Sequence, residues 1–161
     1  MTTPTIRLAR DADAQPIALM SRCLIEVGLR GWSWNPARVT KALRHRDVCV
    51  AVAEGDDKIH GFAIAEFGDT ELHLSLLAVA ATQQRRGIGR ALMAWIEQSA
   101  LTAGITEMQL ELRANNHGAR YFYQSLGFEF AGTVPGYYRG EEAALRMRKA
   151  IGVLASGKVE R

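Results

Sequence analysis

A glycine-rich turn between a predicted strand and a predicted helix is the feature that most constrains this sequence. Residues 72–79 form an apolar run typical of a buried strand, and residues 91–96 have the pattern of an amphipathic helix. The turn between them contains Gln84-Arg85-Arg86-Gly87-Ile88-Gly89-Arg90. The first amides of a helix have no intrahelical acceptor and carry partial positive charge, to which nearby arginines add formal charge. The turn is therefore predicted to bind a phosphate-bearing ligand.

The length and charge of the chain set the class of protein. Its 161 residues are 48% hydrophobic and 23% charged, with a net charge of +3. We expect a single domain spanning 1–161, with a core at about 5–150 and a frayed tail at 152–161. Basic residues alternate with acidic ones, which argues against nucleic acid as a partner. Because there is neither a signal-peptide pattern nor an apolar run of the roughly 18 residues that a membrane helix needs, we expect a cytoplasmic protein with no membrane partner.

Cysteine and histidine usage predicts neither a disulfide nor a metal site. Cys23 and Cys49 lie in apolar stretches and are expected to be buried thiols in a reducing compartment. No pair of Cys or His residues has the spacing of metal ligands, so no metal is expected.

Hydrophobic periodicity and turn residues predict an α/β protein with a mixed sheet and helices on both of its faces. Strands are expected at 6–8, 48–53, 59–67, 71–79, 107–113, 128–134 and 143–149. The first helix is expected to begin at Asp11 or Asp13 and end at Gly28, with Ile17, Met20, Leu24 and Val27 on its apolar face. The other helices are expected from Asn35-Pro36, at 87–103, and from Asn115 or Asn116 to Leu126.

Alternation within two of these strands places polar side chains on a common face. His73 and Ser75 share one face of the strand before the glycine-rich turn, and Gln109 and Glu111 share one face of the next strand. If the two strands are sheet neighbours, these four side chains flank one crevice, which is the arrangement that an acid/base pair needs.

Two sequence blocks resemble the signatures of the GNAT N-acetyltransferase superfamily. Leu77-Ala78-Val79 followed by the glycine-rich turn resembles its acetyl-CoA signature, a strand and then Q/R-x-x-G-x-G/A at a helix start. The segment 110–116 followed by Ala119, Tyr123 and Gly127-Phe128 resembles the second signature block. The later segment 136–147, with Tyr137 and Tyr138, resembles the ending of the branch that acetylates the N-terminal alanine of ribosomal proteins. The resemblance implies the GNAT fold, a mostly antiparallel sheet of about seven strands with a splay between the fourth and fifth strands.

This resemblance implies acetyl-CoA as the donor and coenzyme A as the product. By position, the amides of the turn hold the pyrophosphate, and the backbone of Leu77 and Val79 pairs with the pantetheine arm like an added strand. Asn116 is expected to contact the pantetheine or the thioester end. The implied donor-binding residues are Leu77, Val79, Gln84, Arg85, Arg86, Gly87, Ile88, Gly89, Arg90, Asn116, Ala119 and Tyr123.

The resemblance also implies catalytic roles. Tyr123 matches the position that protonates the departing thiolate, and the amide of Val79 matches the usual oxyanion donor. Glu111 matches the base position of the ribosomal-protein branch, whereas other branches use a glutamate at the position of His73. We expect Glu111 to be the base, with His73 as its rival or its partner through water, because histidine titrates near neutral pH.

The acceptor is left open by the sequence. Trp32, Tyr137 and Tyr138 are expected to border the acceptor site or to pack in the core, and the acceptor itself is either a protein N-terminus or a small amine. The sequence also leaves open whether the protein forms a homodimer. The alternative function is a non-catalytic acyl-CoA-binding regulatory domain on the same fold, because fold alone does not fix function.

Overall fold

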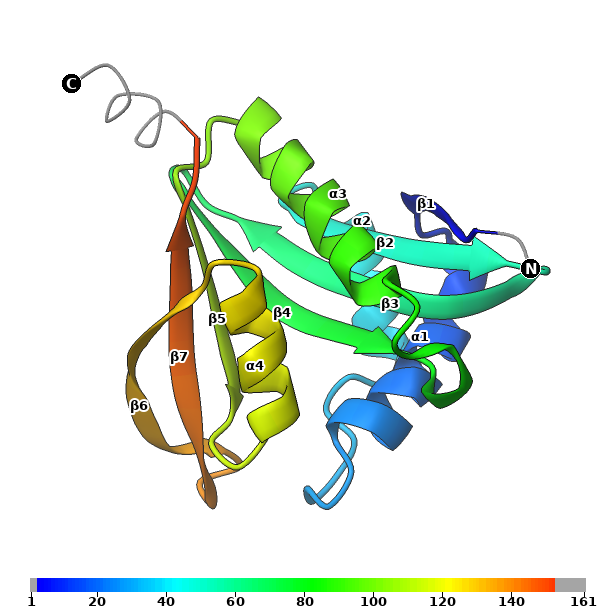
Figure 1. Ribbon diagram of the computed structural model, residues 1–161. Helices are drawn as coiled ribbons and strands as arrows, with labels where there is room; N and C mark the ends of the chain where they lie inside the picture. Colours follow the sequence, from blue (N-terminus) through cyan, green and yellow to red (C-terminus); the bar gives the residue numbers. More distant parts are fainter. Residues whose placement is uncertain (1–2, 153–161) are drawn as a thin grey trace. The chain divides into compact units, whose positions relative to one another are not determined.

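One mixed sheet organises the part of the chain that the structure describes, residues 3–152 of a computed structural model (Figure 1). Within these residues seven strands are hydrogen-bonded in the order β1-β2-β3-β4-β5-β7-β6. The chain divides into two compact units, residues 3–66 with 75–99 and residues 67–74 with 100–152. The predicted α/β class, element order and number of strands are confirmed.

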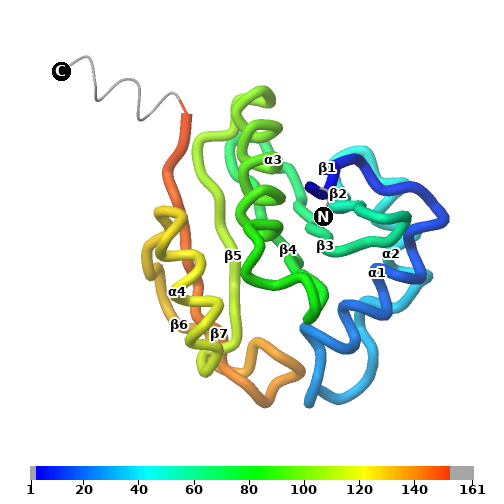
Figure 2. Tube along the Cα trace, turned by 45° about the vertical axis from the view of Figure 1, so that its right-hand side comes forward, coloured from blue at the N-terminus to red at the C-terminus, as the bar shows by residue number. Residues whose placement is uncertain are grey.

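The first unit packs helices on both faces of its strands. It contains β1 (Thr5–Leu8), α1 (Ala14–Met20), α2 (Pro36–Arg44), β2 (Val48–Gly55), most of β3 (Lys58–Phe67), the second half of β4 (Glu71–Val79) and most of α3 (Ile88–Thr102). Ile17 of α1 and Val39 of α2 are buried in one cluster with Phe62 of β3. On the opposite face, a Cβ at Gly61 would lie 3.2 Å from the Ile88 and Leu92 side chains, so the glycine lets α3 approach the sheet closely. Figure 2 shows α3 on one side of β3 and α1 and α2 on the other.

The N-terminal helical region differs from the single helix that was predicted. A 3₁₀ turn (Asp11–Asp13) leads into α1, which continues as a π-helical segment (Ser21–Ile25). The wider π turn changes the phase of the helix, and the helical backbone ends before Val27. Val27 is 58% exposed, so its place in the apolar stripe was wrong. The start of α2 at Asn35-Pro36 is confirmed, since the Asn35 side chain accepts a hydrogen bond from the amide of Arg38 at 3.0 Å.

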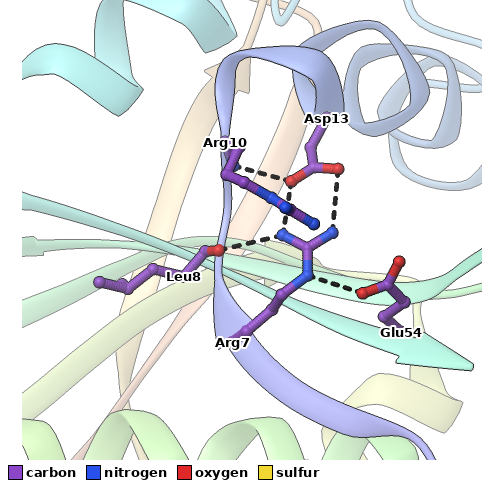
Figure 3. Close-up of polar contacts among 5 residues, drawn as sticks. All are labelled: Arg7, Leu8, Arg10, Asp13 and Glu54. Atoms are coloured by element: carbon purple, nitrogen blue, oxygen red, sulfur yellow. Dashed lines mark hydrogen bonds and ion pairs between the residues drawn. The ribbon is translucent and has the colours of Figure 1, made fainter.

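An ion-pair network fixes β1 to the start of the helical region (Figure 3). Both terminal nitrogens of Arg7 donate to the Asp13 carboxylate, at 2.8 and 3.2 Å, and its Nε donates to Glu54 at 2.8 Å. The amide of Arg10 donates to Asp13 at 2.7 Å. The pKa of Asp13 is lowered, because these hydrogen bonds and the Arg7 charge outweigh the burial that would raise it. One arginine therefore ties an edge strand to its neighbour β2 and to the start of α1.

The second unit contains the strands that carry most of the candidate catalytic residues. Its elements are the first half of β4, β5 (Glu107–Arg113), α4 (His117–Ser125), β6 (Glu129–Tyr138) and β7 (Glu142–Ala150). β4 and β5 pair in parallel from Glu71↔Glu107 to Leu74↔Leu110, and β7 pairs antiparallel with both β5 and β6. The rest of β4 and of β5 lies beyond the parallel register, as the predicted splay requires.

Two further predictions need correction. Cys23 is exposed, because its segment of the π-helical turn faces solvent, whereas half-buried Cys49 has a thiol pKa raised to about 11 by burial. Both are free thiols. The strand predicted at 128–134 extends to Tyr138, because β6 passes Gly132 and Pro135 with two shifts of register instead of ending there. The tail predicted at 152–161 lies, apart from Gly152, outside the described residues.

A membrane-crossing helix is absent from residues 3–152, since none of their helices is both long and apolar enough.

Candidate active site

The glycine-rich turn lies in the first unit and has the backbone of an anion-binding turn. Arg85 and Gly87 adopt left-handed conformations, with φ of 66° and 81°. Alternation of such residues with right-handed ones turns successive amides toward one side of the chain. The first helical hydrogen bond runs from the amide of Ala91 to the carbonyl of Gly87, so the amides of Ile88 and Gly89 precede it. Ile88 is buried and anchors the start of α3, while residues 84–87 are exposed.

A side-chain contact joins this turn to the end of β4. The Gln84 amide group donates to the carbonyl of Val79 at 3.0 Å. Gln84 is the first residue of the signature, so its side chain fixes the distance between the strand end and the turn. Leu77 and Val79 are half-buried on β4. The exposed amides and arginines fit a phosphate group, and the role of Leu77, Val79 and 84–90 in binding the donor stays a prediction.

Glu111 is the centre of a hydrogen-bond cluster in the second unit. Its side chain is 6% exposed. Oε1 lies 2.5 Å from Nε2 of His73 and accepts from the Tyr137 hydroxyl at 3.1 Å, and Oε2 accepts from Nε of Arg146 at 2.8 Å. His73 and Glu111 are thus in direct contact, not joined through water as one reading of the sequence had it.

The cluster keeps Glu111 ionised. Burial alone would raise the pKa of this carboxyl, but hydrogen bonds from His73 and Arg146, the His73 charge and the Tyr137 hydroxyl lower it to about 2. A carboxylate with so low a pKa binds a proton weakly at neutral pH. It is suited to hold a cation or to orient a neighbouring donor.

The other two side chains of the predicted crevice are Ser75 and Gln109. Their surroundings differ from those of His73 and Glu111. Gln109 is opposite His73 in the parallel register, but its side chain donates to Glu71 and Glu107, at 3.2 and 2.7 Å. Ser75 lies on β4 after the last parallel pair and belongs to the first unit. Within the second unit, His73 lies opposite Gln109 in the parallel register and makes a direct side-chain contact with Glu111.

Tyr123 lies on α4 and is almost fully buried, with 8% of the residue exposed. Its ring makes edge contacts with Phe122 and Phe128 at centroid distances of 5.1 and 5.6 Å. Burial, and to a smaller extent Tyr138, raise the pKa of its hydroxyl, which therefore stays protonated at neutral pH. The same helix begins at Asn116, whose side chain accepts from the amide of Ala119 at 3.1 Å. This cap uses one of the two lone pairs of Oδ1 of Asn116, and the roles of Asn116 and Ala119 in binding acetyl-CoA stay predictions.

The aromatic residues expected near the acceptor have different surroundings. Tyr137 and Tyr138 contact each other edge to face at 4.9 Å, and Tyr137 belongs to the Glu111 cluster. Burial and the neighbouring Tyr137 raise the pKa of Tyr138. Trp32, in the first unit, packs against the core and donates from its ring nitrogen to the carbonyl of Ala18 at 3.2 Å. A border role at the acceptor site stays a prediction for all three.

Arg146 is the residue that sequence reasoning missed. It stands directly opposite Glu111 in the antiparallel register of β5 and β7. The alternation of Arg146 and Arg148 with Leu145 and Met147 is visible in the sequence, and it indicates a polar face for the last strand. The signal that was lacking is the pairing of β5 with β7, because β6 intervenes in the chain.

Comparisons with known proteins agree with this fold. The sequence profile of the acetyltransferase (GNAT) family matches residues 16–128. The [ribosomal protein bS18]-alanine N-acetyltransferase of Salmonella typhimurium is 37% identical over 99 residues, which cover 60% of this chain and 67% of that protein. The chain thus spans about two thirds of this relative.

Solved structures of the same class superpose over most of the chain. The ribosomal-protein-S18-alanine N-acetyltransferase of Escherichia coli has a TM-score of 0.79 at 25% identity, covering 93% of this chain and 95% of that one. The paia N-acetyltransferase of Thermoplasma acidophilum, solved in complex with coenzyme A, has a TM-score of 0.79 at 18% identity, covering 93% of this chain and 100% of that one, and shows a shared fold. The family profile, the relatives and the shared fold define an acetyltransferase type of domain. The chain belongs to the GNAT family of N-acetyltransferases.

Proposed function

We propose that the protein transfers the acetyl group of acetyl-CoA to the α-amino group of a protein N-terminus. The observation that carries the proposal is the contact between His73 and Glu111, a buried ionised carboxylate held against an imidazole. A domain that only binds acyl-CoA has no need of such a pair. The relatives named as acting on the alanine of ribosomal protein bS18 favour a protein N-terminus over a small amine. Because ribosomes are in the cytoplasm, an acceptor of that kind also leads us to propose a cytoplasmic location for the protein.

The reaction needs a neutral amine, and the Glu111–His73 pair supplies the base. An α-amino group has a pKa of about 8, so a modest base deprotonates it at neutral pH. The amine nitrogen then attacks the thioester carbonyl carbon, forming an N–C bond. The C–S bond breaks, and the amide remains on the acceptor.

The departing sulfur needs a proton, which Tyr123 supplies in this proposal. Its buried hydroxyl has a raised pKa and is therefore protonated at neutral pH. The acceptor nitrogen loses two protons in all. The first is taken by the Glu111–His73 pair and released to solvent, and the second, lost to solvent after the attack, balances the proton that Tyr123 gives to the thiolate and regains from solvent. The turn at 84–90 holds the donor through its amides and arginines.

The experiment that tests this function is thiol release from acetyl-CoA with matched acceptors. One peptide begins with a free alanine, the second is the same peptide with its α-amino group blocked and an internal lysine, and the third acceptor is a polyamine. Turnover with the first peptide alone supports the proposal. Turnover with the polyamine alone replaces it by a small-amine acetyltransferase, and coenzyme A binding without any turnover replaces it by the non-catalytic domain.

A further inference from the structure

Arg113, the last residue of β5, carries buried hydrogen-bond donors that have no acceptor in the described part of the chain. Its Nε and Nη2 are both buried, and neither makes a hydrogen bond within residues 3–152. These two nitrogens form one edge of the planar guanidinium group, and their N–H bonds point in the same direction. Because a buried donor without an acceptor is unfavourable, this edge favours the arrival of a ligand oxygen.

The contacts of Arg113 hold the guanidinium group in place without using this edge. Oε1 of Glu142, the first residue of β7, lies 3.5 Å from Nε as an ion pair without a hydrogen bond. The guanidinium carbon lies 6.0 Å from the centre of the Tyr138 ring on β6. All three residues belong to the second unit. Because the Glu142 side chain is 38% exposed, its rotation into solvent would uncover the edge without a change in the strands.

The charges around Arg113 favour a neutral oxygen over a carboxylate as the ligand. Glu142 already balances the charge of Arg113, and Arg146 pairs with Glu111, which lies on the same face of β5 as Arg113. A ligand carboxylate would add a negative charge beside these two acids, at the cost of its own desolvation. A carbonyl oxygen brings no net charge and has two lone pairs, so it can accept hydrogen bonds from Nε and Nη2 together.

The distance between Arg113 and Glu111 matches the repeat of an extended peptide. The two residues are separated by one position on β5, so their backbones lie about 7 Å apart along the strand. Two residues of an extended peptide span about the same length. A peptide whose α-amino group lies at the Glu111–His73 pair therefore brings the carbonyl of its second residue toward Arg113. A simple amine has no carbonyl at that distance.

We propose that Arg113 is a specificity-determining residue that binds the carbonyl oxygen of the acceptor's second residue through Nε–H and Nη2–H. The inference rests on the proposed transfer to a protein N-terminus. Arg113 takes no part in the proton transfers or the acyl transfer. It selects a peptide backbone over a small amine, because only the peptide supplies an acceptor for its buried donors.

Equilibrium binding of two matched peptides tests this assignment without turnover. Both peptides begin with alanine, and in the second an (E)-alkene replaces the peptide bond after the second residue, which keeps the extended shape and removes the carbonyl. Each is titrated by calorimetry into wild-type protein and Arg113→Met, both saturated with coenzyme A. The alkene should weaken binding to the wild type about 10- to 100-fold, as for a hydrogen bond to a charged group. In Arg113→Met the ratio of the two dissociation constants should fall to about one, because only the carbonyl depends on Arg113.

A second substitution and a matched control complete the test. Arg113→Lys keeps the charge but lacks the planar pair of donors, so it should also lower the ratio, and it serves if circular dichroism shows that Arg113→Met is misfolded. Arg148→Met removes the same side chain from an exposed position of β7 and should keep the wild-type ratio.

Equal weakening of both peptides by the Arg113 substitutions would mean that Arg113 only supports the fold, and it would overturn the inference. Equal binding of the two peptides to the wild type, or binding of neither, would overturn it as well. Turnover of the alanine peptide with acetyl-CoA is measured separately. Its absence beside an intact binding difference would overturn the acetyl transfer but not the carbonyl site.

Discussion

Arg146 of β7 donates its Nε–H to Oε2 of Glu111 on β5, at 2.8 Å, from the position directly opposite in the antiparallel register. The bond raises the pKa of Arg146 and contributes to lowering that of Glu111. Arg146 lies outside the two signature blocks and beyond residues 16–128, which the family profile matches. A residue outside those signatures thus fixes the carboxylate on which the proposed base depends.

Replacing Arg146 should therefore impair catalysis more than donor binding. Arg146→Met removes one charge-assisted hydrogen bond of about 1.5 kcal/mol, which corresponds to about a tenfold loss of kcat with little change in the KM for acetyl-CoA. The pKa of Glu111 rises in this variant but starts from about 2, so the carboxylate stays ionised and the loss should vary little with pH near neutral pH. Steady-state kinetics between pH 5.5 and 9, at intervals of about half a pH unit, measure the loss of kcat and its dependence on pH. Arg148→Met removes the same charge from the next outward position of β7 and should have no such effect.

Tyr123→Phe tests the proposed acid. Removal of the hydroxyl should lower kcat by about 10²-fold, because a proton donor to the leaving group acts mainly in the transition state. The affinity for coenzyme A, measured by calorimetry, should change by less than about twofold, because the ring contacts with Phe122 and Phe128 remain. Tyr121→Phe, an exposed position on the same helix, is the control. Equal kcat for the two variants would remove Tyr123 from the reaction.

Gly87→Ala tests the donor-binding turn. Gly87 has a φ of 81°, and a Cβ there would meet nothing within 4 Å, so the substitution strains the backbone without a clash. The left-handed conformation costs an alanine about 1–2 kcal/mol, and relaxation of the turn should raise the KM for acetyl-CoA about tenfold. Gly104→Ala is matched closely, with a φ of 84° and open space, but lies at the other end of α3. Gly104→Ala should lower the melting temperature as much as Gly87→Ala does, but it should leave the KM for acetyl-CoA unchanged. An equal rise of this KM in both variants would contradict the assignment of the turn.

The sequence predicted those parts of the fold that depend on local patterns. Both strands that carry the His73–Glu111 pair were predicted with the observed bounds, because strict alternation and flanking turns define them. The cap at Asn35 was also readable, since a side-chain oxygen before a helix has a local partner, and the last helix was expected to begin at Asn115 or Asn116, of which Asn116 is the cap.

The parts that the sequence left open depend on pairing between distant segments. The choice between Glu111 and His73 needs the contact between them, and Arg146 needs the neighbourhood of β5 and β7. The exposure of Val27 and Cys23 follows from a π-helical segment, whose extra residue per turn has no distinctive local pattern. The alternation of polar and apolar side chains predicts which face of a strand a residue occupies, but the register between paired strands decides which residue it contacts.

The Arg7–Asp13 pair makes a prediction about stability instead of activity. Asp13→Asn should destabilise the folded protein by about 2 kcal/mol at pH 7, because it weakens a charge-assisted contact in which the Asp13 side chain is mostly buried. The pKa of Asp13 is lower in the folded protein than in the unfolded chain, so its contribution is fully present above the unfolded pKa of about 3.9 and is lost as the pH falls through the folded pKa. Urea unfolding at pH 7 should therefore separate the variant from wild type, and the gap should narrow below about pH 4. Asp11→Asn breaks the exposed pair with Arg44 and should cost less than about 0.5 kcal/mol at either pH. A gap for Asp13→Asn that stays constant with pH would mean that its effect comes from packing, not from the ionised carboxylate.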